Sequence, residues 1–179
     1  FAVKKKLLQY AENETFNNLF QPGHDELRSG FPLKGNWHGG FFKNKNPIIL
    51  ELGCGKGEYT VGLARQNREI NYIGIDIKGA RLWRGCKTAI EEGLHNVAFV
   101  RSRIEQIEHL FEKDEVDEIW LTFPDPQPKK RWRRRRLTSP EFILRYAGIL
   151  KEGGIIHLKT DSRFLFNYTR EVIEETGQQ

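Results

Sequence analysis

The sequence predicts an α/β fold built on a doubly wound, mostly parallel β-sheet. From residue 47 onward, short apolar runs alternate with segments of helical pattern, and this alternation is typical of βαβ units. Because βαβ crossovers are right-handed, we expect helices on both faces of the sheet. A second observation is that glycine and aspartate residues follow the apolar runs, at the strand ends where such sheets bind ligands.

The predicted strands are short and apolar, and each is followed by a helical segment. We expect the strands at residues 48–52, 71–76, 96–100, 116–122 and 154–159. We expect the helices at residues 58–66, 78–92, 104–111, 139–150 and 161–176. The fourth of these helices has a clear start, because Ser139 is a typical N-cap residue and Pro140 suits the first turn.

The chain is expected to contain an extension and one α/β domain. Residues 1–46 carry scattered polar and aromatic residues, with helical character expected only within residues 7–20, and are interpreted as an N-terminal extension. Residues 47–179 are interpreted as the α/β domain. The chain begins with Phe1 and has no methionine, so we expect it to be a piece of a longer protein.

Composition argues against several classes of protein. No apolar run approaches the ~20 residues of a membrane-spanning helix, and the first residues lack the apolar segment of a secretory signal. The two cysteines, Cys54 and Cys86, make neither a disulfide framework nor a cysteine-rich metal site, and the histidines show no metal-ligand spacing. We therefore expect a cytoplasmic protein with no membrane partner and no metal.

Positive charge is concentrated in one segment of the chain, the basic run 129–136. The net charge is +5, and subtracting the seven cations of this run leaves −2. Such crowded cations repel one another unless a polyanion binds, and Trp132 within the run offers a ring on which a base can stack. Nucleic acid is the expected partner, and a solvated charge patch is the alternative. The expected RNA phosphate contacts are Lys130, Arg131, Arg133, Arg134, Arg135 and Arg136.

The segment 51–57, Glu-Leu-Gly-Cys-Gly-Lys-Gly, forms a glycine-rich loop after the first predicted strand. Its glycines allow a tight turn and a close approach of ligand to backbone. It is not a Walker phosphate loop, because Gly57 follows the lysine where Ser or Thr is required. Its spacing also departs from the dinucleotide fingerprint G-x-G-x-x-G, which weakens a dehydrogenase interpretation without excluding it. An ordinary strand-to-helix turn, with Cys54 as a small turn residue, is the alternative.

Two carboxylates favour S-adenosylmethionine as the ligand of this loop. Asp76 ends the second predicted strand, where a carboxylate accepts hydrogen bonds from ribose hydroxyls in nucleotide-binding α/β folds. Glu51 would repel a pyrophosphate but suits the ammonium group of a cofactor without phosphates. S-adenosylmethionine has an ammonium group, a sulfonium and a ribose. For Asp76 alone, a solvated strand end is the alternative.

A second loop, 123–128, combines an aspartate with three prolines and follows the strand predicted at 116–122. Its sequence is Phe-Pro-Asp-Pro-Gln-Pro, and the prolines fix the backbone around Asp125 and remove backbone donors. A stiff loop can hold a carboxylate where the edge of a substrate meets it, and a structural turn is the alternative. Lys-Thr-Asp at 159–161 brings a further carboxylate, Asp161, to the end of the fifth strand.

Together these motifs resemble those of the tRNA (guanine-N7)-methyltransferases. The glycine loop is followed by Gly-Ile-Asp-Ile-Lys at 74–78, Phe-Pro-Asp-Pro-x-Pro-Lys-Lys-Arg at 123–131 and Lys-Thr-Asp, in this order. The resemblance covers about residues 31–175, and the Phe-Pro-Asp-Pro block with Lys-Lys-Arg is its specific part. It implies a Rossmann-like class I methyltransferase domain at 47–179 that transfers a methyl group from S-adenosylmethionine to N7 of a guanine in tRNA.

The resemblance also implies roles for individual residues. Asp125 matches the proposed catalytic residue, which also lies near the cofactor. Lys129 and Asp161 match positions that contact the guanine. The implied cofactor-binding residues are Glu51, Gly53, Gly55, Asp76, Arg103 and Asp125.

The chain departs from the family pattern at three places. Gln127 stands where the family often has tryptophan, and Arg103 stands where it usually has an aspartate or asparagine that reads the adenine. The chain ends at Gln179, before the two last strands and the Thr-x-x-Glu segment of the family's substrate pocket. The sheet is therefore expected to lack its last strands in this chain.

Two other functions are alternatives. One is a nucleic-acid methyltransferase that acts on an amino group, whose loop usually reads Asn/Asp-Pro-Pro-Tyr/Phe, which Phe-Pro-Asp-Pro does not match. The other is a non-catalytic RNA-binding module on a methyltransferase fold. The glycine loop, Glu51 and Asp76 argue against that module, because RNA binding alone does not require them.

Overall fold

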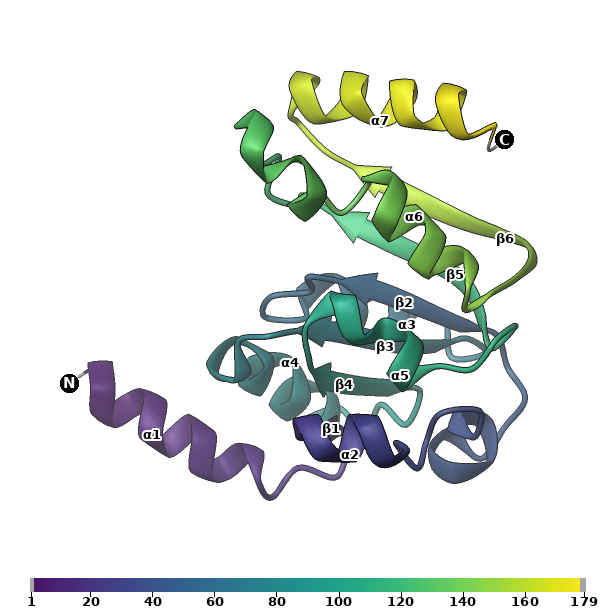
Figure 1. Cartoon of the computed structure of the whole chain (residues 1–179). Helices are drawn as coiled ribbons and strands as arrows, with labels where there is room; N and C mark the ends of the chain where they lie inside the picture. Colours follow the sequence, from purple (N-terminus) through teal and green to yellow (C-terminus); the bar gives the residue numbers. More distant parts are fainter. Residues whose placement is uncertain (1, 178–179) are drawn as a thin grey trace.

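A computed structural model describes residues 2–177 and shows one sheet with helices on both of its faces (Figure 1). The strands are β1 Leu19–Phe20, β2 Ile48–Leu52, β3 Asn71–Asp76, β4 Val97–Arg101, β5 Val116–Thr122 and β6 Leu150–Lys159. The α-helices are α1 Ala2–Asn13, α2 His24–Ser29, α3 Glu58–Gln66, α4 Gly79–Glu91, α5 Ile107–Leu110, α6 Pro140–Ala147 and α7 Arg163–Thr176. Shorter helical turns are η1 His38–Phe42, η2 Ile104–Gln106 and η3 Lys130–Arg135.

The sheet is parallel throughout the part of the chain that the structure describes, in the order β1-β4-β3-β2-β5-β6. From the central β2 the chain passes to β3 and β4 on one side, and then to β5 and β6 on the other. The strand order therefore reverses between β2 and β5. In open α/β sheets ligands bind beyond the carboxyl ends of the strands at this reversal. All strands end at one end of the sheet, beyond their C-termini, which we call the carboxyl edge. All strands begin at the opposite end, which we call the amino edge.

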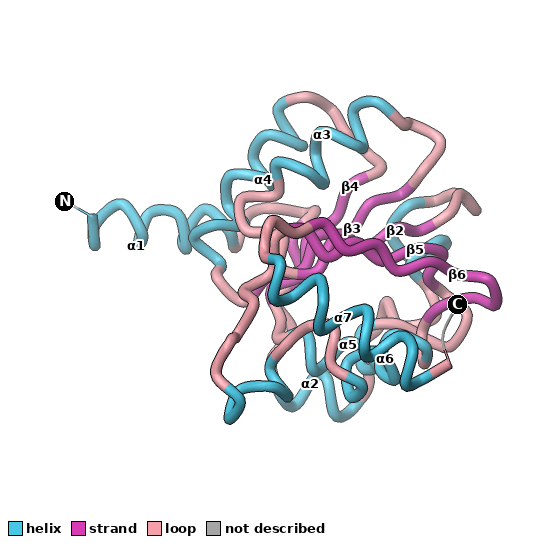
Figure 2. The backbone as a smooth tube through the Cα atoms, turned by 90° about the horizontal axis from the view of Figure 1, so that it is seen from above, coloured by secondary structure: helices cyan, strands magenta, loops and turns pink. Residues whose placement is uncertain are grey.

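Helices α3 and α4 cover one face of the sheet, and α2, α5, α6 and α7 lie on the other (Figure 2). Every residue of β2 and β3 is buried, as expected for parallel strands covered on both faces. One apolar core, which includes Leu82 and Phe99, fills the α3–α4 side. The other core includes Leu50 and Tyr146 and fills the opposite side. The doubly wound parallel fold expected from the sequence is confirmed.

The first 46 residues contribute to this same fold. Helix α1 begins before the expected helical range 7–20 and ends within it, and α2 is a further helix outside that range. The short β1 pairs with β4 at the edge of the sheet. Trp37 is fully buried, donates from Nε1 to the carbonyl of Leu110 at 3.0 Å and stacks on Phe111. The division of the chain at residue 46 stays a prediction. Phe31, Trp37 and Phe42 of this segment nevertheless pack in the same core as Leu50 and Tyr146.

The remaining elements follow the predicted order with shifted ends. The segment 104–111 begins as the turn η2 before α5, and β6 starts at Leu150 because its ladder with β5 continues past an irregularity at Val116 and Glu118. The basic run folds into η3. Among the described strands, β6 is the last one at its side of the sheet. Within residues 2–177, no helix is both long enough and apolar enough to cross a bilayer.

Candidate active site

The glycine loop closes tightly over the end of β3. Gly53, Gly55 and Gly57 have φ of 74°, 58° and 74°, in the left-handed region that favours glycine. The N–H groups of Gly53 and Cys54 both donate to the carbonyl of Ile75, at 2.8 and 3.1 Å. A Cβ atom on Gly57 would lie 2.6 Å from the Phe99 ring, so no larger residue fits there. Burial raises the pKa of the Cys54 thiol, which agrees with a small turn residue rather than a nucleophile.

Asp76 connects the end of β3 to this loop. Its Oδ2 accepts a hydrogen bond from the N–H of Gly55 at 2.9 Å, and its Oδ1 accepts one from the N–H of Lys78 at 2.9 Å. The side chain is buried against the loop but lies at the carboxyl edge. Each carboxylate oxygen has more than one lone-pair direction, so both can still accept a hydrogen bond from a ligand hydroxyl.

Glu51 links three elements across the strand-order reversal. Its Oε1 accepts a hydrogen bond from the hydroxyl of Thr60 on α3 at 2.7 Å, and its Oε2 accepts one from the hydroxyl of Thr122 at the end of β5. Burial raises the pKa of Glu51, although the two hydroxyl groups partly oppose this shift. A cation placed beside this buried carboxylate would stabilise its charged form. Neither threonine carries a sequence signal that distinguishes it from other threonines in the chain.

The loop that carries Asp125 leaves β5 beside the end of β6. The N–H of Phe123 donates to the carbonyl of Lys159 at 2.7 Å, and Oδ1 of Asp125 accepts from the N–H of Gln127 at 3.0 Å. Phe123 and Gln127 have φ of 48° and 47°, an uncommon conformation for residues other than glycine. Backbone of this kind often occurs at functional sites. The carboxylate of Asp125 is exposed to solvent at the carboxyl edge.

Arg136 requires a correction, because the structure places it inside the protein rather than on an RNA-binding surface. Only 6% of the residue is exposed. Its guanidinium donates to the carbonyls of Gln127 and Pro128 and lies over the rings of Phe164 and Tyr168 in α7. From the sequence, Arg136 was expected to contact phosphate because it belongs to a run with six other cations. We remove it from that set, since its donors hold the Asp125 loop.

The other cations of the basic run are exposed on η3 and at its start, at Lys129, Lys130, Arg131, Arg133, Arg134 and Arg135. Trp132 is partly buried and is surrounded by three of them, with the charged atoms of Lys129, Arg131 and Arg135 at 4.7, 5.1 and 5.9 Å from its ring. Three cations of the run therefore lie around the indole ring. The sequence position of Trp132 had suggested a ring open for stacking of a base, but in the structure the ring is partly buried and flanked by these cations.

The remaining predicted residues also lie at the carboxyl edge. Arg103 is exposed just beyond β4, whose last residue Arg101 pairs with Asp76 in the ladder. Asp161 is exposed two residues after the end of β6. The sequence did not single out Lys159, whose ammonium contacts the hydroxyl of Tyr59 and lies 5.7 Å from the Phe123 ring centre. The fold thus gathers the ends of β2, β3, β4, β5 and β6 into one candidate site.

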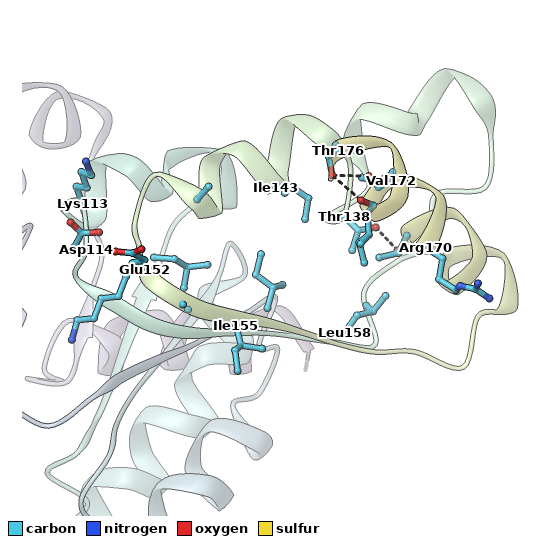
Figure 3. Close-up of a pocket in the computed structure, with 18 of the residues that line it drawn as sticks. Lys113, Asp114, Thr138, Ile143, Glu152, Ile155, Leu158, Arg170, Val172 and Thr176 are labelled. Atoms are coloured by element: carbon cyan, nitrogen blue, oxygen red, sulfur yellow. Dashed lines mark hydrogen bonds between the residues drawn. The ribbon is translucent and has the colours of Figure 1, made fainter. Parts of the chain in front are cut away.

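A large cavity lies away from the candidate site. It has a volume of about 1150 Å³ and lies between β6 and the helices α6 and α7 (Figure 3). Its wall is mainly apolar and includes Ile143, Leu158 and Val172, and none of the predicted site residues lines it. Cavity size therefore does not locate the candidate site, which is defined by the reversal of strand order and by the polar groups gathered there.

Comparisons with known proteins agree with this arrangement. Residues 45–179 match the model of a family described as "Putative methyltransferase". The tRNA (guanine-N7)-methyltransferase of Christiangramia forsetii is 57% identical over 98% of this chain and 79% of the relative. That of Porphyromonas gingivalis is 54% identical over 92% of this chain and 68% of the relative. The chain belongs to the tRNA (guanine-N7)-methyltransferase family.

The solved structure of an antibiotic-related methyltransferase has the same fold as this family member. Its TM-score is 0.57 at 20% identity, over 76% of this chain and 70% of the other. The family and the class I methyltransferase fold imply S-adenosylmethionine as methyl donor. The site fits that donor, because Glu51 is a buried carboxyl group beside a glycine loop and Asp76 has free acceptor capacity. Among residues 2–177, no group of three or more His, Cys, Asp or Glu side chains is arranged to hold a metal ion.

Proposed function

We propose that this methyltransferase transfers a methyl group from S-adenosylmethionine to N7 of a guanine in tRNA, at the reversal point between β2 and β5. One observation carries the proposal. The carboxylate of Glu51 accepts hydrogen bonds from Thr60, behind the glycine loop, and from Thr122, directly before the Asp125 loop. A single buried group therefore fixes the two loops that must hold the two reactants in mutual position.

The cofactor is assigned to the glycine-loop side of the site. Glu51 would face its ammonium group and Asp76 its ribose hydroxyls, while the left-handed conformations of Gly53 and Gly55 allow the backbone to approach it closely. Arg103, two residues beyond the end of the adjacent β4, would contact the adenine side. When bound, S-adenosylmethionine supplies a methyl group on a sulfonium, which is electrophilic without help from a metal.

The guanine is assigned to the loops that follow β5 and β6. Guanine N7 has an in-plane lone pair and no proton, so its bond to the methyl carbon forms as the bond from that carbon to sulfur breaks. No base has to remove a proton first. Asp125 and Asp161, both exposed after these strands, would accept hydrogen bonds from the N1–H and N2–H₂ edge, and Lys129 would also contact the base. Their negative charge would also offset the positive charge that builds up on the ring.

The contribution of the protein is then mainly alignment. Good positioning of two reactants can lower a barrier by ~7–11 kcal/mol, which is ample for a nucleophile that needs no activation. The braced backbone of the Asp125 loop fits this role, because Arg136 and Lys159 both hold it to other elements. The exposed cations of the basic run would bind the phosphates around the target base.

The experiment is to incubate the full-length protein with unmodified tRNA and methyl-labelled S-adenosylmethionine, and to map the methylated atom by mass spectrometry of nucleosides. We expect 7-methylguanosine at one position of the tRNA, and transfer that is ~10²–10³-fold slower in the Asp125→Ala variant. Methylation of an exocyclic amino group would contradict the proposal. Cofactor binding without any transfer to tRNA would contradict it as well.

A further inference from the structure

A second cationic surface lies on the N-terminal helix and on the helix that follows β3. It combines residues that are more than 70 positions apart in the sequence. We call it the α1–α4 surface, and its exposed cations are Lys4, Lys5, Lys6, Lys78, Arg81 and Arg84. The sequence had assigned the basic character of the chain to the run at 129–136 alone. In the fold, charges outside that run lie on two helices that contact each other.

The C-terminal end of helix α1 is anchored to α4, while the rest of the helix projects from the domain (Figure 2). Asn13 is buried and donates from Nδ2 to the carbonyl of Gly79 at 2.9 Å. Glu12 accepts hydrogen bonds from Nε1 of Trp83 at 2.7 Å and from Nζ of Lys87 at 2.9 Å. The bond from Lys87 lowers the pKa of Glu12, so this carboxylate stays charged. The one acidic residue of α1 is thus engaged in anchoring the helix rather than in neutralising its three lysines.

The α1–α4 surface adjoins the candidate site. Helix α4 begins three residues after Asp76, and a Cβ atom on Gly55 would lie 3.0 Å from Nη2 of Arg81. The guanidinium of Arg101, at the end of β4, lies 5.4 Å from the centre of the Tyr10 ring in α1. In Figure 1, α1 (purple) and the helical turn that carries the basic run (green) project on the same side, where the arrowheads of the strands point. The two cationic surfaces therefore flank the site, one beside β3 and β4 and the other after β5.

The lysines of α1 are suited to a polyanion. All three are exposed, and none of them forms an ion pair with any residue that the structure describes. Consecutive helical residues point about 100° apart, so the three ammonium groups cover an arc of about 200° rather than a single line. Close cations without counter-ions repel one another, and this repulsion is relieved when several phosphates bind.

We propose that the α1–α4 surface is a second phosphate-binding surface for the substrate RNA, so that the tRNA contacts the enzyme on both sides of the site. This inference rests on the proposed function. Helix α1 also exposes Leu7 and Leu8, as a helix that binds an anionic membrane would. RNA is favoured, because Lys78, Arg81 and Arg84 extend the positive surface along α4 toward the site. A membrane-binding helix would not need cations there.

The test compares two triple variants of the full-length protein. Lys4→Gln, Lys5→Gln, Lys6→Gln removes three charges from α1. The matched control, Lys45→Gln, Arg68→Gln, Lys113→Gln, removes three exposed charges that precede β2, β3 and β5 at the amino edge. The affinity for unmodified tRNA is measured against salt concentration, and S-adenosylmethionine affinity is measured separately.

We expect the α1 variant to flatten the slope of log affinity against log salt by about 2, at roughly 0.7–0.9 for each phosphate that the variant no longer neutralises. The control variant should keep the wild-type slope, both should keep the cofactor affinity, and a variant with arginine at positions 4, 5 and 6 should bind as wild type does. An unchanged slope in the α1 variant, or an equal loss in the control, would overturn the inference. The inference would also be overturned if the α1 variant lost affinity for phosphatidylserine vesicles but not for tRNA.

The methylation assay separates this inference from the proposed function. If the wild type methylates guanine N7 and the α1 variant keeps its slope, the inference fails and the proposed function stands. If the wild type binds tRNA through α1 but methylates another atom, the proposed function fails and the surface stands.

Discussion

Nε of Arg136 donates a hydrogen bond to the backbone carbonyl of Gln127 at 3.0 Å. The last cation of the basic run therefore holds the far end of the loop that carries Asp125. The guanidinium also lies 4.8 Å from the Phe164 ring and 4.4 Å from the Tyr168 ring, so helix α7 supports the same arginine. One side chain thus joins the loop after β5 to the helix after β6.

Replacing Arg136 should disturb the loop without changing the charge interactions with RNA. We expect Arg136→Ala to lower the free energy of unfolding by about 2–3 kcal/mol, because hydrogen bonds to a buried charged group are removed. Methyl transfer should fall, while the salt dependence of tRNA affinity stays as in wild type. Arg136→Lys should rescue this only partly, since lysine lacks the planar fork. Normal stability with a flatter salt slope would instead make Arg136 a phosphate contact.

Glu51→Gln should lower the affinity for S-adenosylmethionine without lowering the free energy of unfolding at neutral pH. Because burial raises the pKa of Glu51 above its ordinary value of 4.5, the folded protein binds this proton more tightly than the unfolded chain does. Protonation of Glu51 therefore adds to the free energy of unfolding below pH 4.5, and this contribution is lost as the pH rises through the folded-state pKa of Glu51. The charged group therefore costs stability at neutral pH.

For the glutamine variant we expect an unfolding free energy at neutral pH that is equal to or above that of wild type, and a weaker dependence on pH above 4.5. Its affinity for S-adenosylmethionine should fall at least ~10-fold, because the ammonium group loses its anion. Denaturant unfolding across pH and calorimetry measure the two effects. Lower stability at every pH with normal cofactor affinity would make Glu51 only an anchor for Thr60 and Thr122.

Asp76→Ala should weaken S-adenosylmethionine binding at least ~10-fold, on the order of one charge-assisted hydrogen bond. The loss has two sources, since Asp76 also holds the N–H of Gly55 in the glycine loop. Asp161→Ala is the matched control, because this carboxylate lies at the same edge but is assigned to the guanine. Calorimetry that finds equal cofactor affinity in wild type and Asp76→Ala would refute the ribose assignment.

Neutralising Arg133, Arg134 and Arg135 should flatten the salt slope of tRNA affinity by about 2, at roughly 0.7–0.9 for each phosphate that is no longer neutralised. The one ion pair that these arginines form within residues 2–177, between Arg134 and Glu141 at 3.4 Å, is exposed and should add little to stability. Cofactor affinity should not change. A slope identical to that of wild type would mean that the run is a solvated surface.

The sequence carried enough information for the central strands and for the carboxylates at their ends. β2 and β3 are mostly apolar because both faces are covered. Glu51 interrupts the apolar residues of β2, and Asp76 ends β3. β1 has only two residues, too few for any periodic pattern, and its place depends on pairing with β4.

Interactions between distant residues account for what the sequence did not predict. In the sequence, Arg136 cannot be told apart from the neighbouring arginines. Its different role depends on contacts with the rings of Phe164 and Tyr168 in α7, about 30 residues later. The same holds for Thr60 and Thr122, which become functional candidates only because Glu51 lies between them. Likewise, the cluster on α1 and α4 exists only once the chain is folded.

The role of Asp125 is the central claim, and the single-turnover rate of methyl transfer tests it most directly. We measure this rate for wild type, Asp125→Ala and Asp125→Asn from about pH 6 to 8, with the cofactor saturating and the enzyme in excess over tRNA. The alanine variant should keep its fold and tRNA affinity, because Asp125 is exposed on a loop braced by other residues. Its rate should fall ~10²–10³-fold, the usual cost of one positioned transition-state interaction.

The rate of Asp125→Asn should fall less than that of Asp125→Ala if hydrogen-bond geometry dominates. It should fall as much if the negative charge opposite the forming cation dominates. In wild type the rate should be flat across this pH range, since N7 has no proton to lose. A log-linear rise of the rate with slope one, abolished in Asp125→Asn, would contradict the alignment mechanism and show that Asp125 acts as a general base.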